Sequence, residues 1–435
     1  MPEVDLVDPR AKVGRGSSPT GTPNLERIAA VVIGAGQAGL SASHELAVRG
    51  IEHVVLERGA LGDTWRTRRW RSFHIVSPNS LNLLPGYEYD GPEPDAFLDT
   101  HGLLAYLEAY AASFAAPVRS ESPVDEVRPA DGGGFLVRTP HSELHARHVI
   151  VATGAFGAAH TPALAANLPA SIQSLHTDDY WAPEDLPPGG VLVVGSGQSG
   201  LQIAYELANA GRDVTVAIGK HGWVPRRVYG RDQMWWRWDN RKYHEVVADP
   251  DRPKADYPFT YLARWGVNDF NVRTVWQAGA RLAGHVVGVD GMRIRLARDL
   301  EALLRAGDQE ARTFVAWVRD FARARGENVP EPELESHWRD GEIPEAPDAL
   351  DLGSAGIRTV IWSTGYRQDF SWIRVPGALA VNGAPYQRQG VSPAPGIYFV
   401  GLHRMWEAGS GTLLGCGWAA TNVAEHVAAR VRASG

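Results

Sequence analysis

Two glycine-rich segments of the chain have residue types and a spacing that suit the binding of a dinucleotide. Gly34-Ala35-Gly36-Gln37-Ala38-Gly39 follows an apolar run at 28–33, and Gly195-Ser196-Gly197-Gln198-Ser199-Gly200 follows another at 191–194. Glycines at these positions allow a tight turn, close approach of the backbone to a pyrophosphate, and close packing of the next helix. The N–H groups at the start of that helix then face the phosphates. A preceding apolar run makes each copy more specific than GxGxxG alone, so the sequence predicts two dinucleotide sites.

The residues that follow the second strand of each unit differ in charge. Glu57 closes the first unit, where a carboxylate can accept hydrogen bonds from ribose hydroxyls, as FAD requires. The second unit has no carboxylate there and instead has Lys220, with Arg226 and Arg227 beyond it. A charge-assisted hydrogen bond contributes about 1.5–3 kcal/mol, which is enough to favour NADPH over NADH. We therefore expect FAD in the first site and NADPH in the second, unless these cations only decorate a surface loop.

Apolar runs, and the prolines and glycines that interrupt them, predict the strands and helices that must position these residues. Each unit is predicted as strand, helix and strand, which is the start of a parallel sheet with helices on its faces. The predicted strands lie at 28–33, 53–56, 124–128, 135–139, 144–146, 149–151, 191–194, 214–218, 360–362 and 397–400. A predicted helix follows each fingerprint, the first ending at about 48 and the second at about 210, and further helices are predicted at 101–114, 295–325 and 413–431. Prolines and glycines at 183–190 indicate a crossover between two domains.

The fold class predicted from this order is α/β, with one dinucleotide-binding domain inserted into another. The expected division is a flexible tail at 1–26, an FAD-binding domain at 27–187 and 366–435, and an NADPH-binding domain at 188–365 with a helical insertion around 295–330. The long helix of that insertion has one apolar face, so a packing or dimer helix is a simpler interpretation than a functional lid.

Composition excludes several classes of function. Hydrophobic residues make up 44% of the chain, the net charge is −7, and no strongly basic block is present, so nucleic acid is not expected as a partner. No run of about 18 apolar residues predicts a membrane span. The single cysteine, Cys416, cannot form an internal disulfide or a redox pair, which favours the cytoplasm and argues against a disulfide reductase. No metal site is expected.

Further motifs, taken in order, resemble the class B flavin-containing monooxygenases and most closely their bacterial CzcO-like branch, over about residues 28–431. Besides the two fingerprints, the landmarks are Gly62-Asp63-Thr64-Trp65-Arg66 with Arg69-Trp70, Ala152-Thr153-Gly154, His176 within 175–180, Gly222 to Arg227, Asn271 to Thr274, Ser363-Thr364-Gly365-Tyr366, and Gly401 to Gly417. The resemblance implies a glutathione-reductase-like two-domain flavoprotein.

The resemblance also implies roles for individual residues. Contacts with FAD are implied for Thr64, Trp65, Arg66 and Val124, and for backbone amides at Leu413 and Leu414, which would face the flavin pyrimidine. Thr153-Gly154 and Thr364-Gly365 would be the two joints between the domains. Asn79 would lie near the flavin C4a atom, whereas His176 and Tyr366 would orient the NADP linker. Purely structural interpretations stay open, because Asn79 is a typical turn residue and His176 can form a structural hydrogen bond.

The activity implied is that of an FAD-dependent, NADPH-consuming monooxygenase acting through a C4a-(hydro)peroxyflavin. One oxygen atom from O2 would enter a small organic substrate, with an amine nitrogen or a sulfide sulfur favoured. A Baeyer–Villiger monooxygenase of ketones, an NADPH oxidase and a non-oxygenating NADPH-flavoprotein are the alternatives. The family's FxGxxxHxxx(W/Y) string begins here with Ala170 and Ile172, which weakens the Baeyer–Villiger reading. The sequence leaves a homodimer open. It also leaves open whether Trp235, Trp236 and Trp238 line a cavity or pack a core.

Overall fold

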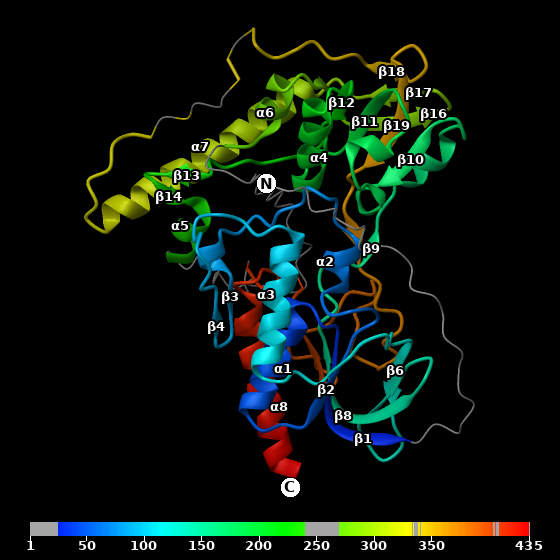
Figure 1. Ribbon diagram of the computed structural model, residues 1–435, viewed down its shortest axis with the longest axis vertical. Coiled ribbons are helices and arrows are strands. Elements are labelled where there is room, and N and C mark those ends of the chain that lie inside the picture. The colour runs from blue at the N-terminus through cyan, green and yellow to red at the C-terminus, as the bar shows by residue number, and fades with distance from the viewer. Residues whose placement is uncertain are drawn as a thin grey trace, which may run out of the picture.

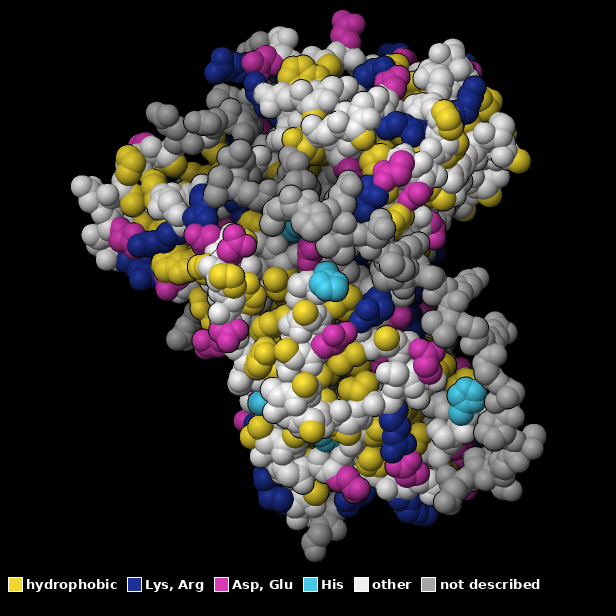
Figure 2. All heavy atoms as spheres, in the orientation of Figure 1, with side chains coloured by type: hydrophobic (Ala, Val, Ile, Leu, Met, Phe, Trp, Pro, Cys, Tyr) yellow, Lys and Arg dark blue, Asp and Glu magenta, His cyan; other side chains and the backbone are white. Residues whose placement is uncertain are grey.

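The structure, a computed structural model, describes residues 25–239, 269–332, 334, 338–339, 341–402, 405 and 409–434. The chain forms two bodies, one above the other in Figure 1, and each is built around a sheet with a parallel centre. Figure 2 shows charged side chains of both signs interspersed over one face of these bodies. The predicted tail, apart from residues 25 and 26, and the segment 240–268 lie outside the described residues. No helix in the described ranges is both long enough and apolar enough to cross a membrane.

The lower body contains the first fingerprint. Its sheet has the strand order β5-β2-β1-β8-β7-β6, and β21 also pairs with β8. The bounds are β1 Glu26–Ile33, β2 His53–Leu56, β5 Val118–Arg119, β6 Glu126–Pro129, β7 Phe135–Arg138, β8 Glu143–Val151 and β21 Ile397–Phe399. Because β1 is parallel to both β2 and β8, Ile33 lies level with Leu56 and Val151, so these three strands end at one edge.

Both faces of the first sheet are covered, which explains why its central strand is a continuous apolar run. Val32 faces a core shared with α1 (Gln37–Val48), α3 (Thr100–Ser113) and α8 (Cys416–Ser434). Val31 faces the opposite core, which includes Phe370 and Phe399. The strand edge that carries the first fingerprint is therefore held by packing on both sides.

The upper body contains the second fingerprint in a sheet of five parallel strands. Its order is β10-β19-β11-β12-β15, with bounds β10 Gln173–His176, β11 Gly190–Val194, β12 Val214–Ala217, β15 Arg281–Ala283 and β19 Ile357–Trp362. Helices α4 (Gln198–Asn209) and α6 (Val272–Gln277) share a core with one face. A small antiparallel sheet of β16 (Val286–Asp290), β17 (Arg293–Leu296) and β18 (Ala349–Asp351) shares a core with the other.

The two bodies are joined by two chain crossings that lie side by side. Strand β9 (Ala158–Ala159) pairs with β20 (Tyr366–Arg367), and the His160 N–H donates to the Gly365 carbonyl at 2.9 Å. The expected joint at Thr364-Gly365 directly precedes β20, and the one at Thr153-Gly154 lies three residues before β9. The long helix α7 spans Leu300–Ala324. Short elements complete the described chain: α2 Asp63–Thr67, η1 Asn79–Leu81, β3 Leu83–Leu84, β4 Tyr87–Glu88, η2 Ala163–Asn167, η3 Thr177–Asp179, η4 Pro183–Asp185, β13 Arg227–Val228, β14 Arg231–Asp232 and α5 Gln233–Asp239.

Two expectations from the sequence need correction. Residues 144–146 and 149–151 belong to one strand, because β8 stays in register with β1 from Leu144 onwards and buries His148. The long helix begins at 300 and not 295, because 293–296 pair with β16 and β18. Residues 173–176 form an edge strand of the second sheet, and the domain division at 187 stays a prediction.

The long helix α7 is a packing helix. Its buried side chains, which include Phe314, Val315 and Val318, contact Trp236 of α5 in one cluster. Trp236 is fully buried, and its indole N–H donates to the Val228 carbonyl at 2.9 Å. Of the two interpretations offered for the tryptophans, a cavity lining or core packing, Trp236 therefore follows the second.

Replacing Trp236 with alanine should destabilise this packing by about 3–5 kcal/mol, because the change leaves a large cavity and an unpaired carbonyl. Chemical unfolding followed by circular dichroism measures the loss. The matched control is Trp317→Ala, since Trp317 belongs to the same cluster but is only partly buried. An equal loss for both variants would contradict the prediction.

Candidate functional site: a dinucleotide cavity and a second fingerprint

Each glycine of the first fingerprint meets a separate geometric requirement. Gly34 has φ +107°, and a Cβ there would lie 2.7 Å from the Ala152 carbonyl oxygen. A Cβ on Gly39 would lie 1.7 Å from the Gly34 oxygen, so helix α1 packs onto its own loop. A Cβ on Gly36 would meet no atom within 4 Å. The tight turn, the helix contact and the open approach that a pyrophosphate needs are thus all present.

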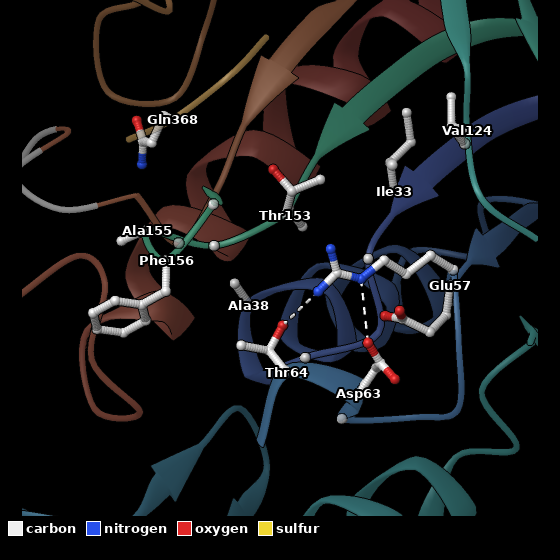
Figure 3. Close-up of a pocket in the computed structure, with 18 of the residues that line it drawn as sticks. Ile33, Ala38, Glu57, Asp63, Thr64, Val124, Thr153, Ala155, Phe156 and Gln368 are labelled. Carbon is white, nitrogen blue, oxygen red and sulfur yellow. Dashed lines mark hydrogen bonds and ion pairs between the residues drawn. The ribbon is translucent and has the colours of Figure 1, made fainter. Parts of the chain in front are cut away.

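A cavity of about 380 Å³ extends along this loop and the ends of the strands beside it. In Figure 3, Glu57 and Val124 lie at one end of it and Ala155, Phe156 and Gln368 at the other, with Thr153 between them and helix α1 behind. The loop residues Gly34, Gly36 and Gln37 line the cavity between these ends, as do Thr153 and Gly154. An elongated ligand with phosphates near its middle fits this order of groups.

Glu57 lies at the predicted strand end and is buried. Its carboxylate accepts from the Ala35 N–H at 2.6 Å and from the Gly59 N–H at 3.3 Å, which holds the fingerprint loop against the strand. Burial is the main cause that raises the pKa of Glu57, and the two N–H groups oppose it. Arg58 donates to Asp63 and Thr64, both at 3.2 Å, and all three residues line the cavity.

The Thr64-Trp65-Arg66 segment lies beside the cavity, and two of its residues line it. Thr64 and Trp65 line the cavity, and the Trp65 indole donates to the Gln37 side chain at 3.1 Å. Arg66 instead donates to Glu108 at 2.9 Å and is not among the lining residues. The reason is helical geometry, because neighbouring residues of α2 point in different directions.

The C-terminal segment reaches the cavity through glycines. Gly401 and Gly411 line it, whereas Leu413 and Leu414 are buried, Leu413 in the core under α1 and α8. Neither Leu413 nor Leu414 lines the cavity, and their expected contact with the flavin stays a prediction.

Sequence reasoning missed Arg69 and Phe156 as lining residues. Arg69 is 7% exposed, and its guanidinium lies over the rings of Trp65 at 4.9 Å and Phe156 at 5.3 Å. Burial lowers the pKa of Arg69. Arg69 was already part of a landmark motif, but no sequence signal separates it from the neighbouring Arg66, Arg68 and Arg71.

The second fingerprint repeats the backbone geometry of the first. Gly195 has φ +112°, and a Cβ there would lie 2.3 Å from the Ser363 oxygen. A Cβ on Gly200 would lie 2.2 Å from the Gly195 oxygen, while Gln198 and Ser199 form the first turn of α4. The Ser196 hydroxyl contacts both the carbonyl and the N–H of Gly219 at 3.1 Å. That contact holds the fingerprint loop beside the segment that leads to Lys220.

The three cations expected near a 2′-phosphate lie in different surroundings. Lys220 comes directly after the Gly219 backbone that Ser196 holds. Arg227 is partly buried and pairs with Asp95 at 3.4 Å. Arg226 is 2% exposed, pairs with Asp232, and donates to the Val76 carbonyl at 2.9 Å. Arg226 thus links the two bodies, and we do not retain it as a phosphate ligand.

His176 and Tyr366 come together at the joint between the bodies, with ring centroids 5.2 Å apart. The Asp178 N–H donates to His176 Nδ1 at 3.2 Å, so the ring proton is on Nε2, which donates to the Gly365 carbonyl at 3.0 Å. Burial is the main cause that raises the pKa of Tyr366 to about 12, and its hydroxyl donates to Asp178. The Thr364 hydroxyl donates to the His160 carbonyl. Neither His176 nor Tyr366 lines the cavity described above.

Asn79 begins the short helix η1 and is 3% exposed. Its side-chain N–H donates to the Glu93 carbonyl at 2.9 Å, and its side-chain oxygen has no partner among the described residues. A buried amide oxygen without a partner costs about 1–3 kcal/mol, so this position is consistent with a polar group supplied by a ligand. Asn79 does not line the cavity.

The described residues include neither a reactive cysteine nor a group of side chains arranged to hold a metal ion. The thiol of Cys416 is fully buried, and burial raises its pKa to about 11, which makes it a poor nucleophile. No group of three or more His, Cys, Asp or Glu side chains that the structure describes is arranged to hold a metal ion.

Comparison with known proteins supports the resemblance seen in the sequence. Residues 31–231 match the family model described as pyridine nucleotide-disulphide oxidoreductase. An uncharacterized CzcO-like oxidoreductase of Geobacillus kaustophilus is 27% identical and covers 89% of this chain and 94% of its own length. Indole-3-pyruvate monooxygenase YUCCA1 of Oryza sativa subsp. japonica is 26% identical and covers 92% of this chain and 91% of its own.

Among solved structures, the flavin-containing monooxygenase of Stenotrophomonas maltophilia has the same fold. It covers 94% of this chain and 100% of its own, with a TM-score of 0.61 and 22% identity. The predicted α/β fold with two Rossmann-like sheets is confirmed, and the chain is similar to CzcO-like oxidoreductases over most of its length, as the sequence motifs indicated.

Proposed function

From this kinship and from the geometry of the two fingerprints, we propose that the chain is an oxidoreductase that binds FAD and NADPH and acts as a flavin-dependent monooxygenase. It uses O2 to oxygenate a small organic substrate, with an amine nitrogen or a sulfide sulfur as the favoured target. The observation that carries the proposal is the pair of matching glycine loops at parallel strand ends, one closed by the acidic Glu57 and the other followed by the basic Lys220.

We assign FAD to the lower body and NADPH to the upper one. Glu57 accepts from the ribose, the amides of 34–39 hold the pyrophosphate, and Phe156 and Gln368 border the flavin ring. The bound flavin supplies the transfer of two electrons from NADPH and the activation of O2. The protein's own task is to hold both nucleotides and keep water out.

His176 and Tyr366 are positioning residues in this proposal. Because Nε2 of His176 and the N–H of His160 both donate to the Gly365 carbonyl, the two chain crossings are fixed relative to each other. Asn79 is assigned to a polar group of substrate or nicotinamide, on the strength of its buried oxygen without a partner among the described residues.

Oxygenation of nitrogen or sulfur is favoured over Baeyer–Villiger chemistry by the environment of residue 172. Where the family string has glycine, Ile172 is 4% exposed and packs among Leu192, Val194 and Val360. The glycine on which that string depends is thus replaced by a core side chain.

The test begins with the visible spectrum of the purified protein and anaerobic addition of NADPH. We expect flavin bands that bleach with NADPH. After ¹⁸O2 is admitted, we expect one labelled atom in an added amine or sulfide. A labelled ester from a ketone would establish the Baeyer–Villiger alternative, and stoichiometric H2O2 with every substrate would establish an oxidase. A protein that takes up no flavin would refute the proposal.

Lys220→Ala should raise the KM for NADPH about tenfold or more and leave the KM for NADH nearly unchanged, because only NADPH carries the 2′-phosphate. Steady-state oxidation of each nucleotide measures both constants. Arg226→Ala is the contrasting variant, since we expect it to weaken the contact between the two bodies and not the preference between nucleotides. Equal effects of Lys220→Ala on the two nucleotides would contradict the assignment.

A further inference from the structure

Arg69 has an unusual environment for a charged side chain. It is almost fully buried, and its guanidinium lies over three aromatic rings, at 4.9 Å from Trp65 and 5.3 Å from both Phe73 and Phe156. One of its nitrogens donates to the Arg68 carbonyl at 2.7 Å. A buried cation is costly unless an anion accompanies it.

Arg69 forms no ion pair with a carboxylate among the described residues. It interacts with the Tyr366 hydroxyl through a hydrogen bond, and with the charge of Asp178, to which that hydroxyl donates. Asp178 already accepts from Tyr366, lies 3.8 Å from Arg68, and lies 3.7 Å from His176. Arg68 and Arg69 thus both lie near one carboxylate, Asp178, while Asp369 lines the same cavity without an ion pair to either of them.

The position of Arg69 along the cavity identifies the anion. Arg69 lines the same cavity as Glu57, but it lies against Phe156, which borders the opposite end (Figure 3). The amides of the fingerprint loop lie between these ends and face the phosphates. Arg69 lies over Trp65, whose indole donates to Gln37 of that loop, and over Phe156, so it extends from the loop towards the end of the cavity where the flavin ring is assigned.

We propose that Arg69 supplies the positive charge that stabilises the flavin ring in its anionic, two-electron-reduced form. The inference rests on the assignment of FAD to this cavity. The charge is poorly screened because the side chain is buried, so it should favour reduced over oxidised flavin strongly. Arg69 has this role without any proton transfer of its own, since arginine stays protonated in proteins.

The experiment compares the flavin midpoint potentials of the purified wild-type holoenzyme and of Arg69→Met, measured by spectroscopic titration against a reference dye. A charge-assisted contact corresponds to about a tenfold to a hundredfold preference for reduced flavin. We therefore expect the potential to fall by about 30–60 mV, at about 30 mV for each tenfold change in a two-electron couple. Arg69→Lys, which keeps the charge, should recover most of this fall.

Arg58→Met is the matched control, because it removes a cation that follows Glu57 and lines the same cavity. It should weaken the binding of oxidised and reduced FAD equally, and therefore leave the potential unchanged. If Arg69→Met does not hold FAD, Arg69→Gln carries the same expectation, since it keeps a hydrogen-bond donor without the charge.

An unchanged potential in the neutral variants would overturn the inference, as would an equal fall in Arg58→Met. Absence of flavin from the wild-type protein would instead refute the proposed function. The two failures are thus distinguishable.

Discussion

Gly200→Ala is expected to give a protein that still binds FAD but whose flavin NADPH reduces about a hundredfold more slowly or not at all. The new Cβ would lie 2.2 Å from the Gly195 oxygen and 2.9 Å from the Ser363 side chain, so the start of α4 has to move away from its loop. A displacement of about 1 Å at a binding site can cost a factor of about a hundred. Stopped-flow measurement of anaerobic flavin bleaching gives the rate directly.

FAD should stay bound in Gly200→Ala because the first fingerprint lies in the other sheet. Gly211→Ala is the matched control, since Gly211 follows the far end of α4, where a Cβ meets open space. Its φ of +77° makes alanine cost about 1–2 kcal/mol, without a clash near the nucleotide. A wild-type rate of reduction in Gly200→Ala would show that NADPH does not use the second fingerprint.

Glu57→Gln is expected to weaken FAD binding about tenfold to a hundredfold, because an uncharged amide replaces the carboxylate that faces the ribose. One amide oxygen also replaces two carboxylate oxygens, which now accept from Ala35 and Gly59. Titration of the apoprotein with FAD, followed by flavin fluorescence, measures the affinity.

The affinity of the wild-type protein for FAD should depend on pH through the same carboxylate. Burial raises the pKa of Glu57 above 4.5 before FAD binds, whereas ribose hydroxyls that donate to the carboxylate lower it in the complex. Binding then releases a proton, so the affinity is full above the raised pKa and falls as the pH drops through it. Glu57→Gln should remove this dependence, and a slope that persists in the variant would assign it to another group.

Local sequence was sufficient for the elements that carry the fingerprints. The runs at 28–33 and 191–194 are strands buried on both faces, and the glycines after them adopt the turn that only residues without a Cβ tolerate. Short-range sterics and hydrophobic burial decide both features, so they can be predicted from the residues themselves. The apolar face of α7 could be predicted for the same reason. The residue at which α7 begins could not be predicted from the sequence.

Side-chain roles at a distance could not be predicted. Among four arginines within six positions, only the fold decides that Arg66 reaches Glu108 while Arg69 is buried at the cavity wall. Arg226, expected near a phosphate, links the upper body to Val76 of the lower one. Strand 173–176 joins the second sheet because its partner, 357–362, lies far away in the chain.

The sequence by itself thus determined the two dinucleotide folds and the charge after each second strand, because these depend on neighbouring residues. Only the tertiary structure decided which cations lie at the cavity and how His176, Asp178 and Tyr366 meet at the joint. The physical reason is that a buried charge or hydrogen bond is set by whichever groups the two sheets bring together, and sequence spacing does not encode that proximity.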